Sequence, residues 1–156
     1  MTNKAELYQD VRKQIASVIA GETSVTARYA TASCILRDAF GERFYWTGFY
    51  LVDPLKPTEL VVGPYQGTLG CLRIPFGRGV CGAAAQSGET QLVEDVHAFP
   101  GHIACDSATN SEIVVPVRDG AGKIAAVLDI DSTQASAFDT IDQTGLEAIC
   151  ADLLTV

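Results

Sequence analysis

Three of the five cysteines stand where a thiol could take part in chemistry. Cys71, Cys81 and Cys105 lie among glycine, proline and polar residues, outside the periodic apolar patterns of the chain. A thiol that attacks an oxidised substrate becomes a sulfenic acid, and a second thiol converts the sulfenic acid into a disulfide. The three thiols therefore favour redox chemistry or a metal site. Cys34 and Cys150 fall in expected helices instead, and we predict that both are small buried residues.

Acidic residues form a second group that could do chemistry. Asp129 and Asp131 interrupt the apolar run AAVLDID, and alternate residues of a strand point to the same face. Glu112 begins another expected strand. If these carboxyl groups share a pocket, burial and mutual repulsion raise their pKa, and a carboxylic acid that stays protonated can donate a proton. Together with the loop thiols, these acids predict a reductase that acts on an oxidised substrate.

Two other kinds of site fit the sequence less well. Residues 77–82 (GRGVCG) match the dinucleotide-binding fingerprint, but the strand before them is short and contains Pro75. A parallel βαβ unit, which that fingerprint requires, does not fit the hairpin order of the strands. His97 and His102 could join the three loop cysteines as zinc ligands, but no CxxC or HxxxH spacing is present. We therefore expect no nucleotide, metal or other cofactor.

The elements that must position these residues are helices at both ends of the chain and strands between them. Apolar residues recur at helical spacing from Leu7 to Ile19, after a capping pair of Asn3 and Glu6, then over residues 25–40 and from about Asp139 onward. Strands are expected at residues 43–52, 59–62, 71–74, 91–93, 112–117 and 123–130, with a short helix at 79–86. Tight turns between successive strands imply antiparallel pairing. This order predicts an α+β fold, with a central antiparallel sheet and helices packed on one face.

Composition limits the setting in which this chemistry takes place. A chain of 156 residues with 47% hydrophobic residues suits one domain. Its 11 basic and 19 acidic residues give a net charge of −8, which disfavours nucleic acid and an anionic membrane as partners. No apolar run is long enough for a membrane helix, and the first ten residues lack a signal-peptide pattern. We expect a cytoplasmic protein whose thiols are mostly reduced.

Several sequence stretches resemble the free methionine-R-sulfoxide reductase family. They are WTGFY at 46–50, GPYQG at 63–67, RIPFGRGVCG at 73–82, QLVEDVHAFPGHIACD at 91–106, SEIVVP at 111–116 and VLDIDS at 127–132. The resemblance covers nearly all of the chain after residue 40, and the run from Val93 to Cys105 is highly specific. It implies a single GAF domain over residues 1–156 that reduces free methionine-(R)-S-oxide to methionine, with thioredoxin as the reductant.

The resemblance also implies roles for the thiols and for two aromatic residues. Cys105 corresponds to the nucleophile that attacks the sulfoxide sulfur, and Cys71 to the thiol that resolves the sulfenic acid as a disulfide. Cys81 corresponds to a third thiol, which either forms an alternative disulfide or lines the pocket. Trp46 and Tyr50 share one face of a strand and resemble the aromatic wall around the substrate methyl group.

The polar ends of the substrate are assigned by the same resemblance. Glu112 and Asp131 would hold the sulfoxide oxygen and donate its proton, and Asp129 would hold the amino group. Backbone N–H groups around Ile103 and Ala104 would bind the carboxylate. A closed pocket that contacts both ends would exclude a peptide.

One segment and one alternative function complete the expectations. The segment 94–111 carries Cys105 and lacks a periodic pattern, and a loop of this length is usually functional. We expect it to act as a lid that opens so that Cys105 can meet Cys71. The alternative is a GAF module without enzymatic activity that senses a small ligand such as a cyclic nucleotide. The pocket acids suit an ammonium better than a phosphate. The chain could also pair with a second copy of itself.

Overall fold

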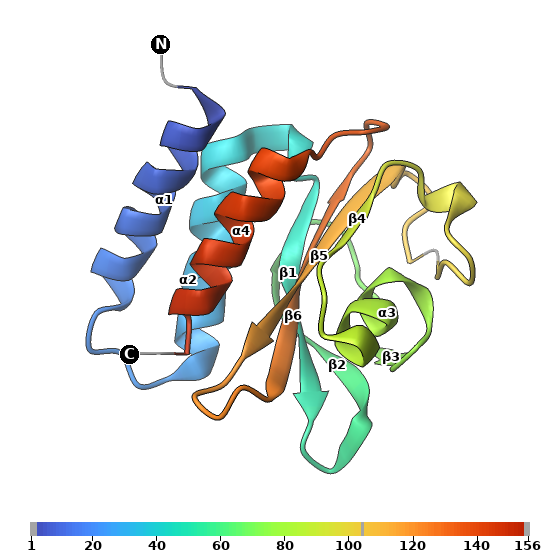
Figure 1. The fold of residues 1–156 in the computed structure, drawn as a ribbon, viewed down its shortest axis with the longest axis horizontal. Coiled ribbons are helices and arrows are strands. Elements are labelled where there is room, and N and C mark those ends of the chain that lie inside the picture. Colours follow the sequence, from blue (N-terminus) through green and yellow to red (C-terminus); the bar gives the residue numbers. More distant parts are fainter. Residues whose placement is uncertain (1–2, 104, 155–156) are drawn as a thin grey trace.

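A six-stranded antiparallel sheet forms the centre of the computed structural model, which describes residues 3–103 and 105–154 (Figure 1). The strands follow the order β3-β2-β1-β6-β5-β4, and every neighbouring pair is antiparallel. Their bounds are β1 (Trp46–Asp53), β2 (Lys56–Gln66), β3 (Arg73–Pro75), β4 (Gln91–Val93), β5 (Ser111–Arg118) and β6 (Ile124–Ser132). β1 begins three residues later than the predicted strand because Gly41–Arg43 form the short 3₁₀ helix η1.

Helices lie on both faces of this sheet, but unequally (Figure 1). One face is covered by α1 (Lys4–Ile19), α2 (Val25–Phe40) and α4 (Thr140–Asp152), and the other carries α3 (Gly79–Ser87). The predicted α+β fold, with a central antiparallel sheet and a helical layer on one face, is confirmed; the short helix α3 is an addition to the second face. Among the described residues, no helix combines the length and hydropathy that a membrane crossing requires.

Side chains at the helix ends fix where the helices begin. Asn3 and Glu6 form the predicted capping box of α1, in which the Asn3 side chain accepts a hydrogen bond from the Glu6 N–H over 2.8 Å. Ser24 caps α2 with one hydrogen bond, which its side chain accepts from the Ala27 N–H over 3.2 Å. Asp139 caps α4 and accepts hydrogen bonds from the N–H groups of Ile141 and Asp142. These caps satisfy backbone donors that have no partner within the helix.

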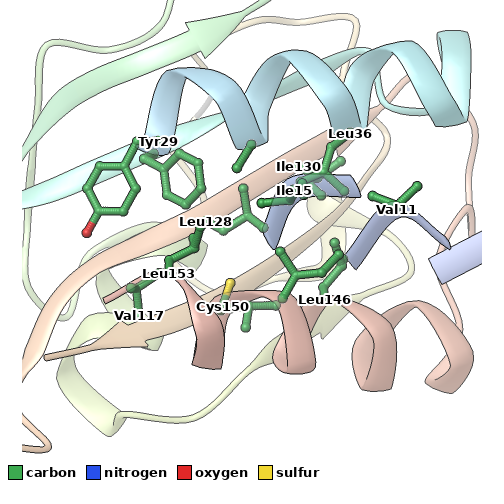
Figure 2. Close-up of a cluster of buried hydrophobic side chains, with 14 of the residues drawn as sticks. Val11, Ile15, Tyr29, Leu36, Val117, Leu128, Ile130, Leu146, Cys150 and Leu153 are labelled. Atoms are coloured by element: carbon green, nitrogen blue, oxygen red, sulfur yellow. The ribbon is translucent and has the colours of Figure 1, made fainter. Parts of the chain in front are cut away.

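The main hydrophobic core fills the space between the helical layer and the sheet (Figure 2). α2 turns Tyr29, Ala32 and Leu36 into this core, and the Tyr29 ring stacks on Phe49 of β1 with centroids 4.4 Å apart. Cys150 of α4 is buried in it, as predicted.

The predicted burial of Cys34 is wrong, because this cysteine is exposed. The buried residues of α2 are Arg28, Tyr29, Ala32, Ser33 and Leu36, which share one side of the helix. At about 100° per residue, position 34 lies on the opposite side, so its side chain points away from the core. A second core cluster lies between α3 and the opposite face of the sheet, and it includes Trp46, Tyr50 and Cys81.

Candidate active site

The register of three strands brings the acidic residues together on the α3 face of the sheet. Glu112 of β5 and Trp46 of β1 each lie opposite Asp131 of β6, so the three residues form one row across the sheet. Asp129 lies two residues before Asp131 and points to the same side. Intervening residues such as Ile130 enter the helical core instead. The structure therefore brings together the three acids that the sequence singled out, and all three line one pocket.

Glu112 and Asp129 are buried and Asp131 is half-buried, and the described residues place no compensating positive charge among them. Glu112 is 6% exposed and Asp129 is 4% exposed. One carboxylate oxygen each of Asp129 and Asp131, Oδ1, is buried and has no hydrogen-bond partner among the described residues. Of the described residues that line the pocket, only Arg78 carries a fixed positive charge, and its side chain is exposed. A ligand that brings an ammonium group would supply what this pocket lacks.

Burial changes the protonation of the acidic group. It raises the pKa of Glu112 well above its ordinary value, and the negative charges of Asp129 and Asp131 add to this shift. Burial likewise raises the pKa of Asp131 well above its ordinary value, with repulsion from Asp129 as the second cause. Burial raises the pKa of Asp129 as well. The three acids titrate as a coupled group and retain protons at a pH where isolated carboxyl groups are ionised.

Cys81 faces the same acids from the first turn of α3. Its Sγ lies 3.9 Å from Glu112 Oε2, and its side chain is buried. Burial, followed by the negative charges of Asp129, Glu112 and Asp131, raises the pKa of the Cys81 thiol well above its ordinary value. A thiol held protonated in this way is a weak nucleophile.

One group of side chains in the pocket has the spacing of metal ligands. The ligand atoms of Cys81, Glu112 and Asp129 all lie within 4.8 Å of one another. This group is different from the set weighed in the sequence, because His97 hydrogen-bonds to Asn110 Oδ1 over 3.2 Å and two of the loop cysteines form a disulfide. The three residues belong to the pocket with the unpaired acids, so a cation there would occupy the place of an organic ligand.

Cys71 and Cys105 are joined by a disulfide, with their Cα atoms 5.4 Å apart and a sequence separation of 34 residues. Cys71 is half-buried just before β3, and Cys105 is exposed. In the segment 94–111 that carries Cys105, residues 94–103 and 105–110 form one regular element, the 3₁₀ helix η2 (Val96–Ala98), before β5 begins at Ser111. Its ends are fixed, because Val96 N–H donates to the Asn110 carbonyl and Asn110 N–H donates to the Ser132 carbonyl.

Aromatic rings form one wall of the pocket. Trp46 and Tyr50 lie on the same face of β1, as predicted, with ring centroids 5.6 Å apart and planes inclined by 18°. Tyr65 of β2 extends the stack, with its centroid 4.9 Å from that of Trp46, and sequence reasoning missed this residue. Gly48 makes the stack possible, because a Cβ there would lie 2.2 Å from the Tyr65 Cβ. The sequence signal that could have found Tyr65 is its place in the GPYQG stretch.

The loop contributes the opposite wall. Ile103 lines the pocket and packs against Gly79, which has a φ of +63° and where a Cβ would lie only 3.2 Å from Ile103 Cγ1, so a side chain there would be strained and crowded. His102 also lines it, with Nε2 3.9 Å from Glu112 Oε1, and burial lowers the pKa of His102 so that the ring stays neutral. The sequence had suggested His102 as a possible zinc ligand and had not placed it beside Glu112. Ala104 lies outside the described residues.

With the disulfide in place, the enclosed cavity measures about 30 Å³. Pockets that hold small organic ligands measure roughly 300–1,000 Å³. An amino acid cannot enter a cavity of this size, although the groups that would bind one are already assembled around it. The lining must therefore move before such a ligand can bind, and the loop that carries Ile103 and Cys105 is part of that lining.

Known proteins share both this sequence and this fold. The GAF-domain family matches residues 23–154. The chain is 46% identical over 151 residues to the free methionine-R-sulfoxide reductase of Escherichia coli K12, which covers 97% of this chain and 88% of that protein. The chain belongs to the free methionine-R-sulfoxide reductase family. The Saccharomyces cerevisiae protein of the same name is 38% identical over 150 residues, which is 94% of this chain and 83% of that protein.

A solved structure of the family agrees with this assignment. The free methionine-R-sulfoxide reductase of Neisseria meningitidis, solved in complex with its substrate, superposes with a TM-score of 0.92 at 48% identity. The match covers 98% of this chain and 89% of that protein. The resemblance and the GAF fold predicted from the sequence are thus confirmed.

Proposed function

We propose that the protein reduces free methionine-(R)-S-oxide to methionine. The observation that carries this proposal is a pocket lined by Glu112, by Asp129 and Asp131, whose buried Oδ1 atoms have no hydrogen-bond partner among the described residues, and by Cys105 of the Cys71–Cys105 disulfide. A free amino acid brings the ammonium that such a pocket lacks, and an oxidised substrate needs the thiols. Relatives that carry the name of this activity, at 46% and 38% identity, support the same substrate.

The reaction runs in two steps whose atoms balance within the protein and its substrate. The Cys105 thiolate attacks the sulfoxide sulfur, the oxygen passes to Cys105 as a sulfenic acid, and methionine leaves. The Cys71 thiolate then attacks the sulfur of the Cys105 sulfenic acid, so the S–S bond forms as the S–O bond breaks and water leaves. The two electrons that the substrate gains are those lost by the two thiols.

In this proposal the three acids bind two different polar groups of the substrate, the sulfoxide oxygen and the ammonium. Glu112 and Asp131 hold the sulfoxide oxygen and supply its proton, which their raised pKa values allow near neutral pH. Asp129 holds the ammonium through its unpaired Oδ1. The backbone around Ile103 and Ala104 binds the carboxylate. A peptide-bound sulfoxide lacks the ammonium and is rejected, since it would leave buried acids unpaired.

Two further parts of the pocket lining have roles in this proposal, namely the aromatic wall and Cys81. Trp46 and Tyr50 enclose the methyl group of the substrate with their stacked rings. Cys81 lines the pocket beside Glu112, and its raised pKa supports this role over that of an alternative resolving thiol.

The proposal also includes the movement of the loop segment, the reductant, the cellular location and the oligomeric state. The segment 94–111 opens to admit the substrate. Because the Cys71–Cys105 disulfide is formed while the cavity is small, closing of the segment, and not the opening expected from the sequence, brings Cys105 to Cys71 in this proposal. Thioredoxin regenerates the two thiols, and the chain acts as a single GAF domain over residues 1–156 in the cytoplasm. A homodimer is compatible with the proposal, and light scattering on the purified protein would measure it.

An assay that resolves the two epimers tests this function. With dithiothreitol as the reductant, the wild type should consume the R epimer of free methionine sulfoxide and leave the S epimer. Cys105→Ser should be inactive, whereas Cys34→Ser, which removes an exposed thiol outside the pocket, should behave like the wild type. Equal consumption of both epimers, or turnover by Cys105→Ser at the wild-type rate, would contradict the proposal. Calorimetric titration with cyclic nucleotides should give no heat of binding, which separates the enzyme from a GAF sensor.

A further inference from the structure

The two segments that the disulfide joins are also tied together by hydrogen bonds that involve no sulfur. Asp106, directly after Cys105, accepts a hydrogen bond on Oδ2 from the Tyr45 hydroxyl over 2.8 Å and another from the Thr68 hydroxyl over 2.6 Å. Its other oxygen, Oδ1, accepts from the Ala108 N–H over 2.8 Å. We call Tyr45, Thr68 and Asp106 the Asp106 latch. Hydrogen bonds from Thr68, Ala108 and Tyr45 lower the pKa of Asp106, which is therefore ionised at neutral pH.

The partners of Asp106 belong to a well-fixed part of the molecule. Tyr45 directly precedes β1, and the indole of the next residue, Trp46, donates from Nε1 to the Thr68 carbonyl over 2.8 Å. The chain between Thr68 and Cys71 packs closely on the same indole, because a Cβ at Gly70 would lie 2.9 Å from Trp46 Cζ2. The latch therefore fixes Cys105 relative to the segment that carries Cys71.

We propose that Asp106 is a positioning residue for the second step of the reaction: the latch holds Cys105 beside Cys71 while Cys105 is a sulfenic acid. This inference rests on the proposed function. Because no latch contact involves a sulfur atom, these contacts can form before the disulfide does. In the step that they assist, the Cys71 sulfur bonds to the Cys105 sulfur, the S–O bond breaks, and the oxygen leaves as water.

The physical reason is the entropy of bringing two loops together. Cys71 and Cys105 are 34 residues apart, and in the proposed function Cys105 lies in a segment that opens for the substrate. Holding two reacting groups in contact raises their effective concentration. Hydrogen bonds to an ionised acceptor are stronger than neutral ones, so two of them can bias the segment toward its closed position. Asp106 itself lines the pocket, but Tyr45 and Thr68 are not among its lining residues, so loss of their hydroxyls should leave the first step unchanged.

The variant Tyr45→Phe/Thr68→Val tests the latch by removing both hydroxyl donors. Asp106 and its bond to Ala108 remain, so the local turn is kept. One equivalent of substrate is mixed with reduced protein, and methionine, disulfide and the dimedone adduct of the Cys105 sulfenic acid are followed by mass spectrometry. We expect methionine to form at the wild-type rate. Disulfide formation should slow about tenfold, as loss of about 1.4 kcal/mol of hydrogen bonding implies, and the dimedone adduct should increase.

Two control variants separate the latch from general loosening of the segment. Thr68→Ser with Tyr45 intact keeps both hydroxyls and should resolve at the wild-type rate. Asp95→Asn weakens another side-chain cap in the same segment, the Asp95 Oδ1 contact to the His97 N–H at 2.9 Å, which does not reach Cys71. It should also resolve at the wild-type rate. Resolution by Tyr45→Phe/Thr68→Val as fast as in the wild type, or equal slowing by Asp95→Asn, would overturn the inference.

A second measurement needs no substrate. At equilibrium with glutathione buffers, the double variant should favour the reduced form about tenfold more than the wild type, which is a rise of about 30 mV in reduction potential. If the wild type fails to turn over methionine sulfoxide but this shift is present, the proposed function fails and the latch is kept. If the wild type turns over and neither the resolution rate nor the potential changes in the double variant, the latch fails and the function is kept.

Discussion

The two faces of the sheet are built from the same strands and have opposite electrostatic character. On the helical face, Leu128 and Ile130 of β6 are fully buried among apolar side chains. On the α3 face, Asp129 and Asp131 from the same strand point into a pocket where one oxygen of each has no described partner. Adjacent residues thus serve different purposes. The first face contributes stability, whereas the second keeps an arrangement that is unfavourable until a ligand binds.

The largest expected effect comes from neutralising one acid of the pocket. Glu112→Gln keeps the shape of the side chain but cannot donate a proton as a carboxylic acid does. We expect kcat/KM for free methionine-(R)-S-oxide to fall by roughly 10²–10⁴-fold. The ligand-free protein should become more stable by about 0.5–2 kcal/mol, because one buried acid with a raised pKa is removed. Steady-state kinetics and urea unfolding measure the two effects, and a variant that loses both activity and stability would contradict the contrast between the faces.

A substitution on the helical face should lower stability and leave activity nearly unchanged. Leu128→Ala leaves a cavity in the main core, where Leu128 is 0% exposed, and should cost about 2–5 kcal/mol in the free energy of unfolding. Activity per folded molecule should stay close to that of the wild type. Leu55→Ala is the matched control, because Leu55 is 94% exposed and its loss should change stability by less than about 0.5 kcal/mol. Loss of activity in fully folded Leu128→Ala would show that the two faces are not separable.

The pH dependence of stability should also distinguish the faces. An acid whose pKa is raised by folding binds more protons in the folded state, so stability is lost as pH rises from its unfolded pKa, about 4, to its folded pKa. Glu112 and Asp131 belong to this class. The midpoint of thermal unfolding should therefore increase as pH falls from 8 toward 5. The slope should be smaller in Glu112→Gln, and an identical slope in this variant would contradict the origin assigned to it.

The smallest expected effect concerns Asp139, the N-cap residue of α4. Its pKa is lowered in the folded protein, so its effect on stability has the opposite pH dependence to that of Glu112 and Asp131. The Lys4 ammonium lowers the pKa of Asp139 to about 2, and hydrogen bonds from the N–H groups of Asp142 and Ile141 add to this. Its contribution to stability is present above the unfolded pKa, about 4, and is lost as pH falls toward 2. Asp139→Ala should cost about 1 kcal/mol at pH 7, as the loss of a helix cap does, and less at pH 2. Equal costs at both pH values would contradict this assignment.

Much of this contrast could be predicted from local patterns. The alternation in AAVLDID places Asp129 and Asp131 on one face, and the capping pair of Asn3 and Glu6 marks the start of α1. Both features depend only on residues close together in the chain, so both can be predicted from the sequence. The antiparallel order also follows from short connections.

Other features depend on contacts between distant segments, and the predictions from the sequence missed them or were wrong about them. Small residues do not identify the buried face of a helix, so the exposure of Cys34 could not be read from its alanine neighbours. Tyr65 of β2 stacks on Trp46, and His102 of the loop lines the pocket beside Glu112; only the tertiary fold brings these pairs together. The pairing of Cys71 with Cys105 came from family resemblance, because no rule of spacing selects it among five cysteines.

The most direct test of the central claim compares free methionine-(R)-S-oxide with its N-acetyl derivative. The claim is that the buried acids of the α3 face are left unpaired so that they can receive the ammonium of a free amino acid. Acetylation removes that positive charge and keeps the sulfoxide. We predict that the wild type has a kcat/KM at least about 100-fold higher for the free amino acid. Equal values for the two substrates would contradict the claim.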